Sequence, residues 1–106
     1  MKSYQLSAPA NRDVVDILSY LTDKNPSAAQ RFAHQLFKEF RHLADWPGSG
    51  RLRPEFTRTS LRFWPIGDYL IIYLAEIEPL TIVRILHTSR DITAILNRHL
   101  VSASND

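Results

Sequence analysis

The stretch LRFWPIGDYLIIYLAEIEPLTIVRILHTSRD, residues 61–91, decides the fold of this chain. Two turn-forming dipeptides, at 67–68 and 78–79, divide it into short segments rich in Ile, Leu, Val, Tyr and Phe. Such a pattern predicts an antiparallel β-meander. The three expected strands are 61–66, 69–75 and 80–87. Because the middle segment has no polar face, we expect a central strand that is covered on both sides.

The last of these strands places an arginine among apolar residues. By the two-residue period of a strand, one face holds Leu80, Ile82, Arg84 and Leu86, and the other holds Thr81, Val83, Ile85 and His87. The arginine is either a functional cation or a member of an ion pair with an acid such as Asp91. His87 is either a satisfied histidine at a strand end or an acid–base group.

The first half of the chain predicts one strand and two helices. Residues 2–6 alternate as a strand, and Pro9 then suits the first turn of a helix of about four turns. Asn25 precedes Pro26 and predicts the cap of a second helix that ends near Trp46. The short connection makes the two helices an antiparallel hairpin. Its apolar stripe, which faces the sheet, is Ala29, Phe32, Ala33, Leu36, Phe40 and Leu43.

The element order β, α, α, loop, β, β, β predicts an α+β fold with the helices packed on one face of a single sheet. After the last strand, Asp91 predicts the cap of a short amphipathic helix, and residues 101–106 are expected to fray. With 106 residues, of which 44% are hydrophobic, we expect one domain over 1–106.

Composition excludes several classes of protein. The chain has no cysteine, which excludes disulfides and thiolate metal sites and fits a reducing compartment. It has no apolar run of about 18 residues and no apolar core of a signal peptide at its start, so we expect a cytoplasmic protein that does not enter a membrane. No metal-ligand spacing or glycine-rich phosphate loop is present, and we expect no metal and no cofactor.

The basic residues have an uneven distribution. The net charge is only +2, but ten of the 13 basic residues are arginine, and no lysine follows Trp46. Around the single acid Glu55 lie Arg51, Arg53, Arg58 and Arg62. The planar guanidinium suits carboxylates and phosphates. The segment is therefore either a surface for an acidic peptide or nucleic acid, or a solvated loop.

Five pieces of the sequence, taken in order and spacing, resemble the RelE/ParE toxins of bacterial type II toxin–antitoxin modules, and in particular the ParE branch. They are YQLSAPANRDVVDILSYL, NPSAAQRF, GRLRPEF, LRFWPIGDYLIIY and IVRILHTSRD. The resemblance covers residues 4 to about 96. It implies a β-α-α-β-β-β fold, a bacterial origin, and a cognate antitoxin whose C-terminal segment wraps the toxin, as a possible hetero-oligomer.

The resemblance implies two competing activities. ParE-like members trap DNA gyrase on cleaved DNA, whereas RelE-like members are ribosome-dependent ribonucleases that cut mRNA. In a ribonuclease, Arg51 and Arg53 would match the loop cations, Arg62 the strand cation, Arg84 or Arg90 the late arginine, and His87 the acid or base. In either case we expect one basic patch for the target, made of Arg51, Arg53, Arg58, Arg62, Arg84, His87 and Arg90.

Three features favour the gyrase inhibitor. Arginine is too basic to transfer protons near neutral pH, and no tyrosine follows His87. The WPIGDYLIIY and IVRILHTSRD segments also resemble ParE more than RelE. We therefore expect an inhibitor without covalent chemistry, with a ribosome-dependent endoribonuclease as the alternative and a binding and co-repressor module as a third possibility. We also expect a groove in which the antitoxin buries an amphipathic helix and an extended segment.

Overall fold

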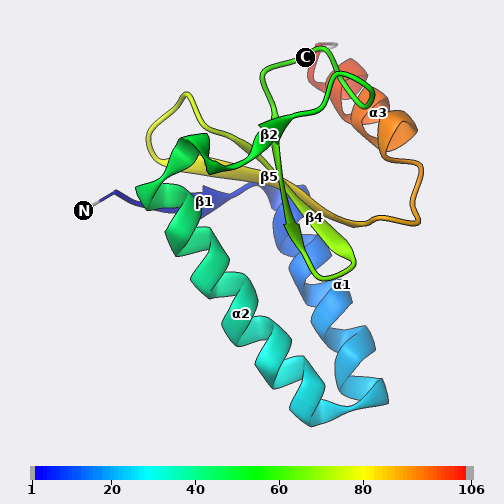
Figure 1. Ribbon diagram of the computed structural model, residues 1–106. Helices are drawn as coiled ribbons and strands as arrows, with labels where there is room; N and C mark the ends of the chain where they lie inside the picture. The colour runs from blue at the N-terminus through cyan, green and yellow to red at the C-terminus, as the bar shows by residue number, and fades with distance from the viewer. Residues whose placement is uncertain (1, 105–106) are drawn as a thin grey trace.

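The computed structural model describes residues 2–104, and the side chains of residues 2–98. The chain opens with a short strand and then forms a helical hairpin, from which it returns to build the sheet (Figure 1). The elements are β1 (Tyr4–Leu6), α1 (Ala8–Lys24), α2 (Pro26–Asp45), the 3-10 turn η1 (Pro47–Ser49), β2 (Arg51–Leu52), β3 (Arg62–Ile66), β4 (Tyr69–Leu74), β5 (Leu80–His87) and α3 (Ile92–Ser104). The predicted fold class is confirmed.

Local caps begin both helices of the hairpin. The Ser7 hydroxyl accepts a hydrogen bond from the backbone N–H of Ala10 at 3.1 Å. The Asn25 side chain accepts from the backbone N–H groups of Ser27 and Ala28 at 3.1 and 3.2 Å. These bonds satisfy amides that have no partner inside a helix. The predicted cap at Asn25 is confirmed, and Ser7 is the residue that caps α1.

The sheet has five strands in the order β1-β5-β4-β3-β2. The meander β3-β4-β5 is antiparallel, as predicted, and β1 lies parallel to β5. Strand β2 was not predicted, because its two residues are exposed and lie in a loop rich in Gly, Pro and Arg. Its place is fixed by pairing, with Arg51 opposite Phe63 and Leu52 opposite Arg62.

A β-bulge interrupts the pairing of β4 with β5. Ile72 pairs with Arg84 and Tyr73 pairs with Ile82, so Val83 is an extra residue in β5. The bulge shifts the alternation of side chains along the strand. The prediction of a strict two-residue period over 80–87 is therefore wrong. Ile85 packs with Leu80 and Ile82 toward the hairpin, and Leu86 packs with Val83 on the other face.

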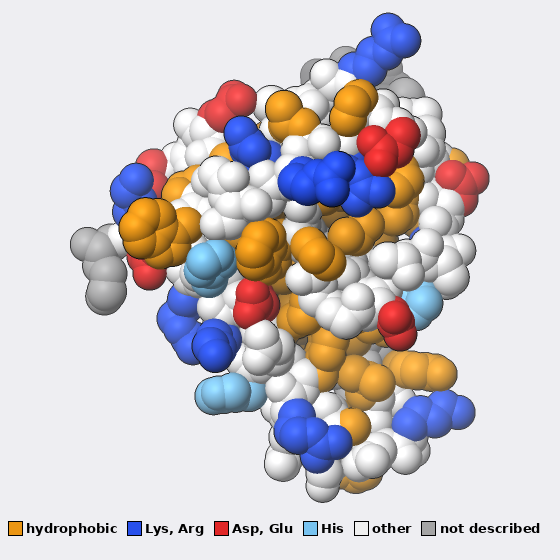
Figure 2. Space-filling model, viewed as in Figure 1, with side chains coloured by type: hydrophobic (Ala, Val, Ile, Leu, Met, Phe, Trp, Pro, Cys, Tyr) orange, Lys and Arg blue, Asp and Glu red, His pale blue; other side chains and the backbone are white. Residues whose placement is uncertain are grey.

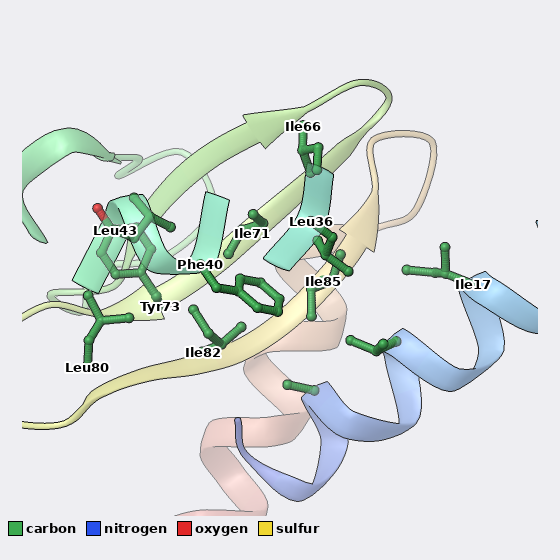
Figure 3. Packing of buried hydrophobic residues seen from close by; sticks show 12 residues of the cluster. Ile17, Leu36, Phe40, Leu43, Ile66, Ile71, Tyr73, Leu80, Ile82 and Ile85 are labelled. Atoms are coloured by element: carbon green, nitrogen blue, oxygen red, sulfur yellow. The ribbon is translucent and has the colours of Figure 1, made fainter. Parts of the chain in front are cut away.

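Both faces of the sheet are covered, which confirms the prediction for the central strand. On one face, Leu36 and Phe40 of α2 pack against Ile71 and other apolar residues of the sheet (Figure 3). The opposite core contains Ile72 and comprises Leu61, Phe63, Leu70, Ile72, Val83, Leu86, Ile92, Ile95 and Leu96. The hairpin lies on a single face, as expected. Helix α3, in contrast, supplies the cover of the opposite face.

The cap of α3 follows the sequence prediction, because the Asp91 carboxylate accepts from the backbone N–H of Ala94 at 3.1 Å. The helix continues to Ser104, beyond the expected end near residue 100. Residues 105 and 106 of the predicted frayed tail lie outside the described residues. Within 2–104, none of the helices has the length and apolar character needed to span a bilayer.

Candidate functional site

The structure places the seven predicted site residues in two separate regions. Arg51, Arg53, Arg58 and Arg62 belong to β2, β3 and the loop between them, whereas Arg84, His87 and Arg90 belong to β5 and the turn that follows it. Strands β3 and β4 lie between β2 and β5 in the sheet. In Figure 2, the Lys and Arg side chains are spread over the visible face with acidic side chains among them. Strand order thus separates Arg51 and Arg62 from Arg84 and His87 within the sheet, and a single patch of all seven residues stays a prediction.

Two of the four arginines in the first region already have partners. The Arg62 guanidinium donates from Nη1 to the carbonyl oxygen of Gly50 at 2.8 Å. Arg53 donates from Nε to Glu55 at 2.6 Å and lies over the Phe56 ring at 4.8 Å. The hydrogen bond from Arg53 lowers the pKa of Glu55, which is exposed. Arg62 thus braces the turn before β2.

A buried phenol holds the same turn. The Tyr73 hydroxyl donates to the carbonyl oxygen of Pro47 at 2.8 Å and accepts from the backbone N–H of Gly50 at 2.7 Å. Its side chain is fully buried, and burial raises the pKa of Tyr73. An added Cβ at Gly50 would lie 2.5 Å from the phenol oxygen, so only glycine fits there. Sequence analysis missed this network, although a tyrosine inside an apolar strand is itself a signal that its hydroxyl has a partner.

In the second region, Arg84 forms a bidentate ion pair with Asp13 of α1. Nε lies 2.7 Å from Oδ2 and Nη2 lies 2.9 Å from Oδ1, and Oδ2 also accepts from the backbone N–H of Ile85 at 3.0 Å. The side chains of Arg84 and Asp13 are 18% and 12% exposed. The hydrogen bond to Asp13 raises the pKa of Arg84.

The predicted partner of Arg84, Asp91, was therefore wrong. Asp91 uses its carboxylate to cap α3. Strand β1 pairs with β5 only as far as Ile82, and the start of α1 continues along that edge. Ser7 donates from its hydroxyl to the carbonyl oxygen of Val83 at 2.8 Å, and Asp13 accepts from the next amide available on the strand. The side chains of Ser7 and Asp13 thus bond to backbone groups of β5 beyond the point where β1 stops.

His87 ends β5 against an aromatic neighbour. Its ring meets Tyr69 edge to face, with centroids 5.0 Å apart and planes at 85°. The Nδ1 atom accepts from the backbone N–H of Ser89 at 3.0 Å. Burial, followed by the nearby Tyr20 and Asp68, raises the pKa of Tyr69. Within residues 2–98, no carboxylate hydrogen-bonds to the imidazole of His87.

The described side chains also define what the site can do chemically. Among residues 2–98, no three His, Asp or Glu side chains come together to hold a metal ion. Arg90 is exposed and lines a cavity of about 510 Å³ together with Arg84 and Arg98. This region offers guanidinium groups for binding anions.

Comparison with known proteins identifies the family. Residues 4–92 match the family described as "ParE toxin of type II toxin-antitoxin system, parDE". The chain belongs to the ParE toxin family. Membership implies an antitoxin partner, and it confirms the resemblance seen in the sequence. A solved structure described as "Chromosomal ParDE TA system from P. aeruginosa" shares the fold, with a TM-score of 0.68 and 17% identity over 82% of this chain and 96% of that chain. A search of curated proteins found no significant match.

Proposed function

We propose that this member of the ParE family is a growth-arresting toxin that binds and inhibits DNA gyrase, and that a cognate antitoxin neutralises it. One observation carries the choice of an inhibitor over a ribonuclease, namely the separation of Arg62 from the other candidate catalytic residues. Arg62 pairs with Tyr73 at one end of β4, and His87 pairs with Tyr69 at the other end.

The separation can be estimated from strand geometry. Four residues of β4 span about 14 Å, and the two outer strands of a three-strand unit lie about 10 Å apart. An RNA-cleaving site needs its acid, base and cations within hydrogen-bond reach of one phosphate, about 3 Å. Arg62 in addition donates to Gly50. These spacings, together with the bond to Gly50, argue against Arg62 and His87 acting on the same phosphate.

The remaining candidates also suit a binding protein better than a nuclease. Arg84 is held by Asp13, and arginine cannot serve as a general base near neutral pH. His87 has no acid partner among the described side chains, because its Nδ1 accepts from the backbone N–H of Ser89, so no carboxylate assists a proton transfer there. These contacts support a toxin that acts by binding.

Exposed apolar side chains on the hairpin support the antitoxin partner. Val15, Tyr20 and Phe37 are 62%, 58% and 36% exposed. Figure 2 shows hydrophobic side chains over the lower halves of the two helices. Burial of such residues is what an amphipathic antitoxin segment would provide, in an interface of more than roughly 1,000 Å².

The test of this function uses purified toxin in two assays. We expect it to inhibit supercoiling by purified gyrase and to leave linear, cleaved DNA, while mRNA on translating ribosomes stays intact. Addition of the cognate antitoxin should restore supercoiling. The ribonuclease would replace the inhibitor if mRNA were cut only during translation, if His87→Ala abolished that cut, and if the wild-type toxin left supercoiling unaffected.

A further inference from the structure

Four arginines from separate segments of the chain line one cavity, which we call the arginine cavity. Its volume is about 510 Å³. Arg12 comes from α1, Arg84 from β5, Arg90 from the turn after β5, and Arg98 from α3. Arg12 is distant from the other three in the sequence, so the fold brings the four guanidinium groups to one place.

The lining of the arginine cavity carries more positive than negative charge. Its four guanidinium groups face two carboxylates, those of Asp13 and Asp16, which leaves a surplus of two positive charges. Within residues 2–98, Arg12, Arg90 and Arg98 form no ion pair. Like charges that share a cavity repel one another, and an anion bound between them reverses the sign of this interaction.

One of the four arginines is held in a fixed orientation. Arg84 donates from Nε and Nη2 to the two carboxylate oxygens of Asp13 at 2.7 and 2.9 Å. A guanidinium has five N–H donors, so three donors of Arg84 have no hydrogen-bond partner among the residues described. Because the ion pair orients these donors before a ligand arrives, binding requires less ordering of the side chain.

The start of α1 adds to the positive potential at the cavity. Pro9 lines the cavity and lies in the first turn of α1, which contains no acidic residue. The first turn of a helix carries a partial positive charge, which an acidic side chain in that turn would offset. In α1 this charge is not offset, and it favours an anion beside Pro9.

The volume and the apolar part of the lining limit the size of the ligand. Cavities of about 300–1,000 Å³ accommodate small molecules, and this one has about 510 Å³. Pro9 and Ile95 add apolar surface to the lining. The cavity therefore has room for a small organic group attached to the anion.

We propose that the arginine cavity binds a dianionic phosphate, either as the free ion or as the terminal phosphate of a small organic monoester. A dianion matches the surplus of two positive charges, and its oxygens accept the bidentate hydrogen bonds that guanidinium groups donate. A phosphodiester in a nucleic-acid backbone carries a single negative charge, so it would leave half of the surplus unmatched. The proposal does not depend on the target of the toxin.

The test is calorimetric titration of the full chain with inorganic phosphate. At about pH 8 phosphate is mostly dianionic, and in about 0.1 M sodium chloride charges more than about 10 Å apart are screened. We expect one site with a dissociation constant of about 1 mM or below. The variant R90A/R98A should weaken binding about tenfold or more, because two exposed charge-assisted donors are lost. D16N should tighten binding about threefold, because it removes a carboxylate that repels the anion.

The matched control is R31A/K38A. It also removes two exposed positive charges, but both come from α2 and neither lines the arginine cavity. We expect its dissociation constant to stay within about twofold of the wild-type value, because distant charges are screened. The control thus separates a local site from an effect of net charge.

NMR of the ¹⁵N-labelled chain locates the ion, and nucleotides distinguish its two sources. Phosphate should shift the Nε–H signal of Arg84 and the backbone amides near Arg12 and Arg90. Adenosine should not bind. Tighter binding of adenosine 5'-monophosphate than of phosphate would support the site and assign it to a monoester, whereas equal binding would support the site and assign it to the free ion.

Four results would overturn the proposal. The first is the absence of saturable binding up to about 10 mM phosphate, a concentration well above the expected dissociation constant. The second is equal binding by R90A/R98A and R31A/K38A. The third is a set of shifts outside the arginine cavity. The fourth is equal binding of methyl phosphate and dimethyl phosphate, which would assign the cavity to backbone phosphodiesters. Gyrase enters none of these measurements, so the cavity and the proposed target can fail separately.

Discussion

Replacing Tyr73 by Phe tests the contact that positions the arginine-rich loop. The substitution removes one oxygen and keeps the ring, so the apolar packing around the fully buried side chain is preserved. It leaves the carbonyl oxygen of Pro47 and the backbone N–H of Gly50 without their hydrogen bonds. The turn that joins α2 to β2 thereby loses its two hydrogen bonds to β4.

The expected loss of stability can be estimated from these two backbone groups, the carbonyl oxygen of Pro47 and the N–H of Gly50. A buried donor or acceptor left without a partner costs about 1–3 kcal/mol. Two such groups that relax partly, or gain a water molecule, give an expected loss of about 2–4 kcal/mol in the free energy of unfolding. This is a large share of the roughly 5–15 kcal/mol that stabilises a small domain.

The assay is equilibrium unfolding in urea, followed by circular dichroism. The midpoint should fall while the slope m stays constant, because the same surface is exposed on unfolding. Tyr4→Phe is the matched control. Tyr4 packs against Phe40, and its hydroxyl makes no hydrogen bond with the residues described, so we expect a change within about 0.5 kcal/mol. If Tyr73→Phe were as stable as this control, the phenol would not hold the turn.

Four further predictions concern this network, the ion pair of Arg84 with Asp13, and Arg90. Burial raises the pKa of Tyr73 above its ordinary value of 10.0, so the neutral phenol stabilises the fold fully below about pH 10, and this contribution is lost as the pH rises further. The free energy of unfolding of the wild type should therefore fall more steeply above pH 10 than that of Tyr73→Phe. Gly50→Ala should lower the urea midpoint, because its Cβ would lie 2.5 Å from the phenol oxygen, and Gly48→Ala, with no atom within 4 Å of the added Cβ, is the control. Arg84→Ala and Asp13→Ala should each cost about 1–3 kcal/mol, and the double variant should cost less than their sum; additive losses would show that the pair has no coupling. Arg90→Ala, at an exposed position, should reduce growth arrest in cells while its circular dichroism stays unchanged, and a fully toxic, folded Arg90→Ala would remove this residue from the mechanism.

Local signals predicted most of the fold. The turn at Gly67, whose φ is +56°, separates β3 from β4 where glycine tolerates a left-handed conformation that other residues rarely adopt. Asn25 and Pro26 mark the start of α2 in the same local way. These features depend on neighbours within a few residues, and sequence patterns record such neighbours directly.

The features that sequence analysis missed depend on pairing between distant segments. Strand β2 exists because its two residues meet β3, and the hydroxyl of Tyr73 finds its partners 23 and 26 residues away. Asp13 and Arg84 are separated by 71 residues. No local pattern distinguishes Asp13 from Asp91 as the partner of Arg84. Asp13 is the partner because β1 ends part-way along β5, and α1 then lies against the remaining edge of that strand.

The bulge in β5 explains why Arg84 forms an ion pair with Asp13. With Val83 as the extra residue, both Val83 and Arg84 stand opposite Ile72, and the strand bends at that point. Val83 takes the apolar position against α3, while Arg84 reaches the edge of the sheet and Asp13. Without the extra residue, the alternation predicted from the sequence would place Arg84 on the apolar face with Leu80 and Ile82, where a guanidinium would require a buried acid. The bulge thus turns one residue of an apolar strand into the ion pair that joins α1 to β5.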